Sequence, residues 1–252
     1  MSLLRTDGLT KQFGGLVAVD DVSFEVDSGE TRAVIGPNGA GKSTLINCIT
    51  GALDPTAGSV EFAGADITDL SPHETVQSGI SKSFQTASIF PSMTVEENVQ
   101  IAALAAEHGS FRFDFLKRLS GFDAVHDTTD RMLSAVELLG DADLEAGSLP
   151  YGDKRRLEIA IALASEPDLL LMDEPTAGMS PDETAATVDL VEDLQEDLGL
   201  TILIVEHDME VIFRISDRIL VLNRGQVIAD GTPEQVQDSE DVQEAYLGGV
   251  EL

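Results

Sequence analysis

The nine residues from Gly36 to Thr44 constrain this chain more strongly than any other stretch. They fit the pattern G-x-x-x-x-G-K-[ST], in which a glycine-rich loop surrounds phosphate groups. A β-branched run precedes the loop at residues 31–35, and residues 45–50 fit the first turns of a helix. In that setting the loop N–H groups and the helix N-terminus converge on anionic oxygens. This favours a nucleoside triphosphate site over a plain glycine-rich turn. The predicted phosphate-binding residues are Gly36, Pro37, Asn38, Gly39, Ala40, Gly41, Lys42, Ser43 and Thr44.

Two loop side chains and two carboxylates have specific expected tasks. Lys42 would reach the β- and γ-phosphates as a point charge, and the Ser43 hydroxyl would bind Mg²⁺. Asp173 and Glu174 follow an apolar run at residues 169–172. Such a run predicts a buried strand of a parallel sheet, and ligands bind at the carboxyl ends of these strands. We expect Asp173 to hold Mg²⁺ and Glu174 to polarise the attacking water, with strand alternation separating the two side chains.

Four further positions are ambiguous on local grounds. His207 follows a second apolar run at residues 201–205, where an imidazole could bind a γ-phosphate or the attacking water. Phe13 could stack on a purine, although packing against a sheet edge is the stronger local interpretation. Gln85 ends a predicted edge strand and could bind Mg²⁺ or water, or be a solvated loop residue. The glycine turn at residues 149–153 precedes a basic segment and could meet an anion, or be an ordinary helix start.

Composition limits the partners of this chain of 252 residues, which carries 15 basic and 46 acidic side chains and a formal net charge of −31. Such a charge argues against direct binding to nucleic acid or anionic lipid. Because the acids are spread among periodic apolar segments, we expect a folded protein. The large net charge suggests a high-salt cytoplasm, where the Debye length falls to about 3 Å at about 1 M salt and repulsion is screened. No apolar run reaches the roughly 18 residues that span a bilayer, and no secretion signal begins the chain. The single Cys48 is expected in the core.

The order of apolar patterns predicts an α/β protein with an inserted helical part. Strand-like runs on either side of Gly14-Gly15 predict an N-terminal hairpin. Helical spacing then starts at Thr94, resumes around residues 129–139 and starts again at Lys154. We therefore expect one domain over residues 1–252, with a nucleotide-binding core at 1–93 and 166–252 and a helical insertion at 94–165.

Taken together, these motifs resemble the ATP-binding subunit of an ABC transporter over essentially the whole chain. The resemblance implies an α/β P-loop NTPase (RecA-like) fold with a parallel-sheet core, an N-terminal antiparallel β part and an inserted α-helical subdomain. It implies that Phe13 stacks on adenine, that Gln85 senses Mg²⁺ and a transmembrane partner, and that His207 is the switch histidine. Leu149 and Gly152 would belong to a signature turn that contacts the γ-phosphate of ATP held by a second subunit.

Several short segments of the sequence are similar to the ATPases of branched-chain amino acid importers. Related importers for urea or short amides share these segments. The similar segments are Gly79-Ile80, Phe84-Gln85, Ile89-Phe90-Pro91 and residues 94–99, 155–160, 206–209 and 245–248. Several positions depart from the wider family pattern, namely Lys82, Pro150, Tyr151, Asp153 and Ser180. These departures would weaken the coupling within the dimer, or indicate a heterodimeric partner that supplies the better half-site. We favour a partner subunit.

The resemblance also implies cofactors, partners and location. ATP with Mg²⁺ would be enclosed by this chain and a second ABC ATPase subunit, in a homodimer or a heterodimer. Closure would drive transmembrane permease subunits at the cytoplasmic face of the membrane, with a solute-binding protein acting indirectly and a docking surface at residues 85–99. The alternatives are a soluble ABC ATPase acting on nucleic acid or ribosomes, which the net charge disfavours, and a small-molecule P-loop kinase. A kinase has no need for Gln85, the signature turn and His207 together.

Overall fold

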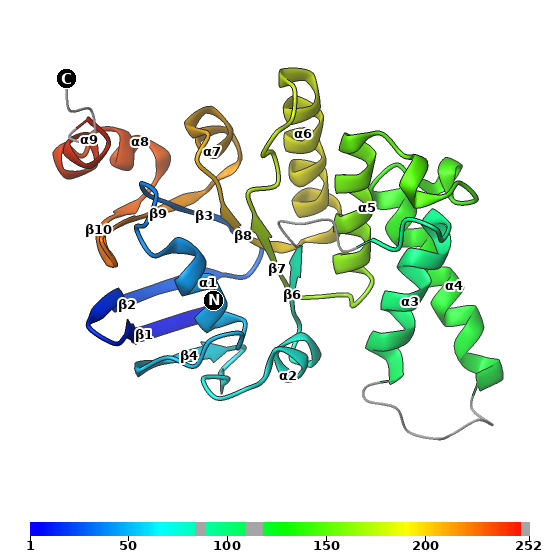
Figure 1. The fold of residues 1–252 in the computed structure, drawn as a ribbon, viewed down its shortest axis with the longest axis horizontal. Coiled ribbons are helices and arrows are strands. Elements are labelled where there is room, and N and C mark those ends of the chain that lie inside the picture. Colours follow the sequence, from blue (N-terminus) through cyan, green and yellow to red (C-terminus); the bar gives the residue numbers. More distant parts are fainter. Residues whose placement is uncertain (84–88, 109–117, 248–252) are drawn as a thin grey trace.

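A six-stranded sheet forms the centre of the protein, whose computed structural model describes residues 1–83, 89–108 and 118–247 (Figure 1). The strand order is β10-β9-β3-β8-β7-β6, and all neighbours are parallel except β9 and β10. Every residue of β3, β7 and β8 is buried, as apolar runs in the middle of a parallel sheet require. The strands are β3 (Thr31–Ile35), β6 (Ile80–Ser83), β7 (Leu169–Asp173), β8 (Thr201–Val205), β9 (Arg218–Asn223) and β10 (Gln226–Gly231).

A second sheet of four strands is antiparallel and contains the N-terminus, in the order β2-β1-β4-β5. The turn at Gly14-Gly15 joins its two longest strands, as the sequence predicts. Buried and exposed residues alternate along the second half of β2, which is typical of a sheet with one face in the core. The strands are β1 (Ser2–Phe13), β2 (Leu16–Asp27), β4 (Ala57–Phe62) and β5 (Ala65–Asp66).

Helix α1 (Lys42–Ile49) joins the two sheets through one hydrophobic cluster. Its buried side chains Leu45, Ile46 and Ile49 share this cluster with residues of both sheets. Cys48 belongs to it as well and is 2% exposed, so its predicted place in the core is confirmed. The helix that follows the glycine-rich loop is therefore anchored by packing on both sides.

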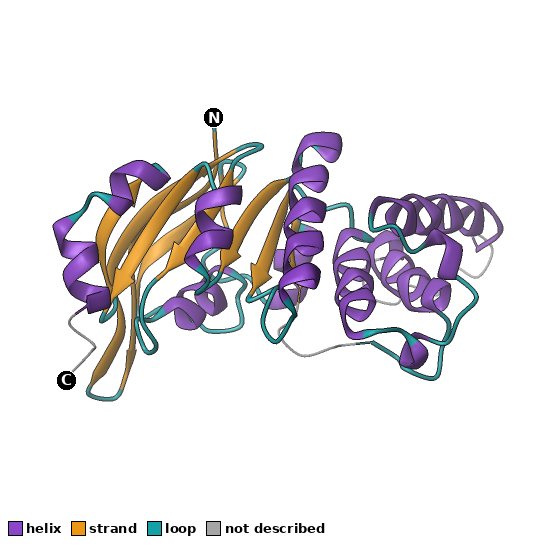
Figure 2. Cartoon of the chain, turned by 90° about the horizontal axis from the view of Figure 1, so that it is seen from above, coloured by secondary structure: helices purple, strands orange, loops and turns teal. Residues whose placement is uncertain are grey.

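The other face of the six-stranded sheet is covered by helices, which Figure 2 shows from above. Helices α6 (Pro181–Leu198) and α7 (Met209–Ile215) contribute to a second hydrophobic cluster, which continues into α3 (Val95–His108), α4 (Arg118–Ala135) and α5 (Tyr151–Leu163). In the described parts of the chain, no helix is long and apolar enough to cross a membrane. The remaining short elements are α2 (Pro72–Gln77), η1 (Leu139–Asp141), η2 (Ala146–Ser148), α8 (Pro233–Gln237) and α9 (Glu240–Leu247).

Two predicted helices have wrong boundaries. The segment expected around residues 129–139 is the end of α4, which starts at Arg118 and stops at Ala135 before Glu137 takes a left-handed φ of 60°. Helix α5 starts at Tyr151 rather than at Lys154, because Pro150 caps it with a φ of −53° suited to a helix start. Gly152 therefore lies in the first helical turn and not in a turn before the helix. The capping box at Thr94 is confirmed, since Thr94 and Glu97 exchange hydrogen bonds of 2.8 and 3.0 Å.

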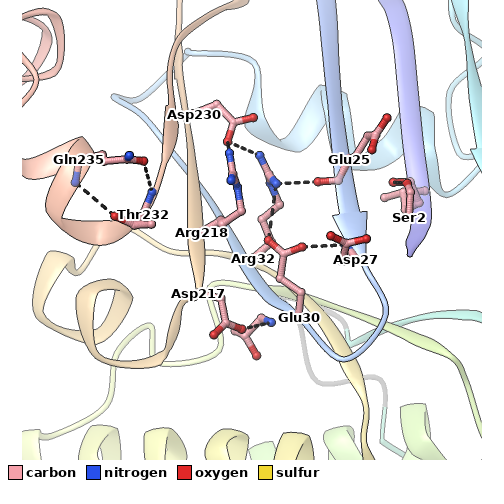
Figure 3. A network of polar contacts seen from close by, with 12 residues as sticks. Ser2, Glu25, Asp27, Glu30, Arg32, Asp217, Arg218, Asp230, Thr232 and Gln235 are labelled. Carbon is pink, nitrogen blue, oxygen red and sulfur yellow. Dashed lines mark hydrogen bonds and ion pairs between the residues drawn. The ribbon is translucent and has the colours of Figure 1, made fainter.

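A polar network ties the two sheets together at the edge that lies away from the glycine-rich loop (Figure 3). Arg32 of β3 is 3% exposed and donates a 2.6 Å hydrogen bond to the Glu25 carbonyl oxygen of β2. It also forms ion pairs with Glu30 at 3.5 Å and with Asp230 of β10 at 2.5 Å. Buried charges need such partners, because an unpaired guanidinium in the core would be strongly destabilising. The network thus fixes how the antiparallel sheet sits on the central one.

Candidate nucleotide site

The glycine-rich loop runs from β3 to α1, and two of its positions have a backbone conformation and surroundings that require glycine. Gly36 has a φ of 151°, and a Cβ there would lie 2.1 Å from the Leu222 carbonyl oxygen. Gly41 has a φ of 106°, and a Cβ there would lie 2.3 Å from the Ala18 carbonyl oxygen. Both glycines are needed because left-handed backbone and close approach coincide. The loop is therefore fitted tightly against β9 and β2.

Backbone hydrogen bonds hold the same loop from outside. The Gly225 N–H donates to the Ala40 carbonyl oxygen at 2.9 Å, and the Asp20 N–H donates to the Gly225 carbonyl oxygen at 2.9 Å. The hairpin turn between β9 and β10 thus lies between β2 and the loop. From the C-terminal helix α9, the partly buried Tyr246 side chain hydrogen-bonds the backbone of Gly36. The loop is held by three separate parts of the chain.

Lys42 is the charged centre of the site and is 9% exposed. Its ammonium donates to the carbonyl oxygens of Gly36 at 2.6 Å and Pro37 at 3.3 Å. Burial lowers the pKa of Lys42, whereas the charges of Glu174 and Asp173 act to raise it. A buried ammonium whose hydrogen bonds among the described residues go to neutral carbonyls gains strongly from an anionic ligand. The arrangement suits a phosphate group.

The two predicted carboxylates lie where β7 ends, beside this ammonium. Asp173 is the last residue of β7 and is 7% exposed. Its Oδ2 forms an ion pair with Lys82 Nζ at 3.1 Å. Glu174 has already left the strand, with a left-handed φ of 51°, while its N–H donates to the Val205 carbonyl oxygen at 2.8 Å. Strand alternation therefore does not separate the two side chains, contrary to our expectation; the turn after β7 sets the direction of Glu174.

Glu206 is a buried acid of this region that our sequence reasoning did not select. Its side chain is fully buried and accepts a hydrogen bond from the Thr176 N–H at 3.0 Å and a second one from the Thr176 hydroxyl. Its other oxygen accepts from the His207 N–H at 2.9 Å. The acid therefore connects the ends of β7 and β8. Its position directly after a buried strand was the signal available in the sequence.

His207 and Phe13 are both accessible to a ligand. The His207 side chain is 64% exposed, with Nδ1 at 3.5 Å from the Glu206 carboxylate. Phe13 ends β1, is 46% exposed and has the Lys11 ammonium 5.2 Å from its ring centroid. The local interpretation of Phe13 as a side chain that packs against a sheet edge stays open, because about half of the residue is exposed to solvent. Stacking on adenine stays a prediction. Gln85 lies outside the described residues.

The start of α5 is engaged within the chain. Leu149 is 5% exposed and belongs to the core, so it presents little surface to a ligand. The backbone of Gly152 hydrogen-bonds the carboxylate of Glu183 at the start of α6. Two basic residues of α5 are paired with acids of the same chain, Arg155 with Glu158 and Arg156 with Glu137. Contact of this segment with an anion stays a prediction.

Comparison with known proteins places the chain in a family. Residues 19–177 match the family model described as ABC transporter. The chain belongs to this family. Residues 226–251 also match the model described as branched-chain amino acid ATP-binding cassette transporter.

Individual relatives and solved structures agree with this assignment. The chain is 40% identical to the high-affinity branched-chain amino acid transport ATP-binding protein BraF of Pseudomonas aeruginosa, over 98% of both chains. It is equally similar to LivG of Escherichia coli, also 40% identical with 98% of both chains covered. The crystal structure of an ABC transporter ATP-binding cassette in its ADP conformation superposes with a TM-score of 0.86, at 34% identity and over 98% of this chain and 99% of the other. The predicted fold class is confirmed by this likeness.

Proposed function

We propose that this chain hydrolyses ATP to drive the import of branched-chain amino acids through membrane subunits. The convergence of Lys42, Asp173 and Glu174 carries the proposal, because both carboxylates act electrostatically on the buried ammonium. The branched-chain substrate is supported by the names of the relatives and by the match of residues 226–251. Urea and short amides stay the alternatives within the same importer class.

The residues at the end of β7 fit a divalent cation. Asp173 supplies a carboxylate and Ser43 supplies an exposed hydroxyl at the start of α1, and hard oxygen donors are what Mg²⁺ prefers. When bound, Mg²⁺ neutralises charge on the β- and γ-phosphates. In the structure, the Lys82 ammonium forms an ion pair with the Asp173 carboxylate. Gln85, which follows β6 by two residues in the sequence, is predicted to complete this site.

The chain's own residues divide the work of hydrolysis. Lys42 and the loop N–H groups hold the phosphates, and Phe13 stacks on the adenine ring. Glu174 accepts a proton from the water that attacks the γ-phosphate, and His207 orients that phosphate from the end of β8. Glu206 keeps His207 and the residues after Glu174 in fixed positions through its hydrogen bonds.

A second ATPase subunit would complete the site, either another copy or a homologous partner. The start of α5, with Leu149 before it and Gly152 in its first turn, would approach the γ-phosphate held by that subunit. Because Gly152 bonds Glu183 within this chain, closing the dimer would exchange one acceptor for another. Closure of the dimer is the two-state change that the membrane subunits would sense.

A groove beside the site is our candidate for docking of a membrane subunit. Its volume is about 520 Å³, and α2, β6, α3 and α5 line it. Alanines 102, 105 and 106 supply an apolar wall, while His73, Lys82 and Glu158 supply polar groups. This mixture fits an amphipathic helical segment of a permease. Docking there would hold the chain at the cytoplasmic face of the membrane. Of residues 89–99, which belong to the surface expected from the sequence, none lines the groove.

Transport into vesicles tests the proposal directly. The chain would be reconstituted with its candidate permease subunits in proteoliposomes, and ATP would be supplied on the side of this subunit. We expect leucine uptake that requires ATP and stops in the Glu174→Gln variant. Uptake of urea or a short amide, with none of leucine, would shift the substrate class. ATP hydrolysis that never depends on membrane subunits would contradict the transport role.

A further inference from the structure

Glu158 of α5 is a buried carboxylate with an incomplete set of hydrogen bonds at the groove. It is 6% exposed and lines the groove between α2, β6, α3 and α5. One oxygen, Oε2, accepts a hydrogen bond from Arg155 at 2.7 Å, while Oε1 has no hydrogen-bond partner among the described residues. Burial raises the pKa of Glu158, although the hydrogen bond and charge of Arg155 oppose the rise. A buried oxygen without a donor is destabilising, so a donor entering the groove would be bound favourably.

Arg155 carries this contact toward the start of α5. Its Nη1 bonds Glu158, and its Nη2 donates to the Tyr151 hydroxyl oxygen at 3.4 Å. The guanidinium carbon also lies 5.7 Å from the centroid of the Tyr151 ring. Burial would lower the pKa of Arg155, but the hydrogen bonds and charges of Glu158 and Tyr151 raise it overall. One planar cation therefore holds an acid of the groove and an aromatic side chain one turn away in fixed relation.

Tyr151 then reaches across to the loop that follows the catalytic carboxylate. Its hydroxyl donates to the Ala177 carbonyl oxygen at 3.0 Å. The Ala177 N–H in turn donates to the Glu174 carbonyl oxygen at 3.2 Å, which closes the turn in which Glu174 has its left-handed φ of 51°. The phenol at position 151 bridges this gap, which a residue without a long side chain could not do. The position of the Glu174 backbone thus depends partly on α5.

We propose that Glu158, Arg155, Tyr151 and Ala177 form a relay from the docking groove to Glu174, in which Tyr151 is a positioning residue for hydrolysis. The partner group that acts on the relay is a hydrogen-bond donor of the docked membrane subunit, cationic or amide. The Glu158 carboxylate would have to turn toward it, because Oε1 is closed off from solvent in the chain alone. The relay rests on the proposed function, because the groove has a meaning for hydrolysis only if a membrane subunit docks there. It goes further by naming the contacts through which docking reaches the catalytic carboxylate.

The test is the Tyr151→Phe variant, which keeps the ring and removes the hydroxyl. ATPase activity would be measured for this chain in complex with its permease subunits, with kcat and KM for ATP obtained separately. We expect kcat to fall about fivefold with KM unchanged, because the lost hydrogen bond positions Glu174 for the reaction and does not contact ATP. The control Ser134→Ala removes an exposed hydroxyl from α4, outside the relay, and leaves both constants at the wild-type values.

Glu158→Gln probes the same relay from the groove. We expect it to reduce stimulation of ATPase activity by the permease, and the double variant with Tyr151→Phe to be no worse than the stronger single variant, because contacts in one network are not additive. Thermal unfolding midpoints near that of the wild type exclude a general packing effect. An unchanged kcat in Tyr151→Phe, or additive losses in the double variant, would overturn the relay. Absence of ATP hydrolysis in the wild-type complex would instead contradict the proposed function.

Discussion

The glycine-rich loop at residues 36–44 and the start of α5 are both expected to contact phosphate groups of ATP, and they are held in different ways. The loop is fixed by backbone hydrogen bonds and by glycines whose Cβ positions are filled by neighbouring carbonyl oxygens. The start of α5 is held by side-chain contacts of Tyr151 and by the Gly152 bond to Glu183.

This difference indicates which part can move. Backbone contacts inside a packed core change only when the fold changes, so the loop is a rigid receptor for phosphate. Side-chain hydrogen bonds at a half-exposed helix start are individually weak and can be exchanged for other partners. We therefore expect the start of α5 to be the adjustable half of the site. The glycine-rich loop, the rigid half, is expected to bind nucleotide without α5.

The largest expected effect follows from removing the charge of the rigid half. Lys42→Ala should abolish measurable ATP binding in a titration calorimeter, because no other described residue places a buried cation among the loop carbonyls. Without nucleotide the variant should fold normally. Retained affinity for ATP would show that the loop does not need this ammonium and would end the assignment.

The difference in stability between the wild type and Lys42→Ala should also depend on pH in a defined direction. The folded-state pKa of Lys42 is lowered by burial, so its charged form is disfavoured by folding below that value. The unfavourable contribution disappears as the pH rises from the lowered pKa toward the ordinary value of 10.5. Urea unfolding of wild type and variant at several pH values should show the wild type gaining relative to the variant over this interval; a constant difference would contradict it.

Glu174→Gln should affect hydrolysis while leaving the rigid half intact. We expect kcat to fall by about 10² to 10⁴, the usual contribution of a general base, with ATP affinity retained. Because ATP persists, dimers with closed sites should accumulate and be seen by size-exclusion chromatography with ATP and Mg²⁺. Turnover like that of the wild type would remove Glu174 from the role of base.

A pair of glycine variants tests the comparison between the two halves directly. Gly36→Ala places a Cβ 2.1 Å from a carbonyl oxygen at a left-handed φ, so the melting temperature should fall by several degrees and ATP binding should be lost. Gly152→Ala adds a Cβ at 3.5 Å from Glu183 within a helix, where alanine is favoured, so stability should be kept. Its loss should be confined to ATP-dependent dimerisation. Equal destabilisation by both would break the comparison.

The smallest expected effect concerns both halves equally. We propose that the net charge of −31 adapts the chain to high salt, since screening relieves repulsion among the acids. The melting temperature should rise between dilute buffer and molar KCl by about 2–4 °C for each kcal/mol of repulsion removed. Full stability in dilute buffer, with no rise in KCl, would contradict the hypothesis.

Much of the site could be predicted from the sequence because its parts are local patterns. The glycine-rich loop needs its glycines at fixed spacing, and a continuous apolar run such as residues 169–172 suits only the middle of a parallel sheet. Period-two runs around Gly14-Gly15 likewise gave the first hairpin. In each case the residues that define the element are neighbours in the chain, so backbone preferences and burial act over a few residues.

Contacts between distant segments were decided only by the tertiary structure. Glu206 meets Thr176 thirty residues earlier, and Tyr151 meets Ala177 twenty-six residues later, through side chains whose reach no local pattern encodes. Helix α5 starts at Tyr151 because the fixed φ of Pro150 suits a helix start. The residues after Pro150 show no apolar helical spacing that would have predicted this start. The sequence alone thus determined the glycine-rich loop at Gly36–Thr44 and predicted that it binds phosphate, because backbone geometry there is local. Which groups surround the loop was decided by packing between elements that the chain brings together only on folding.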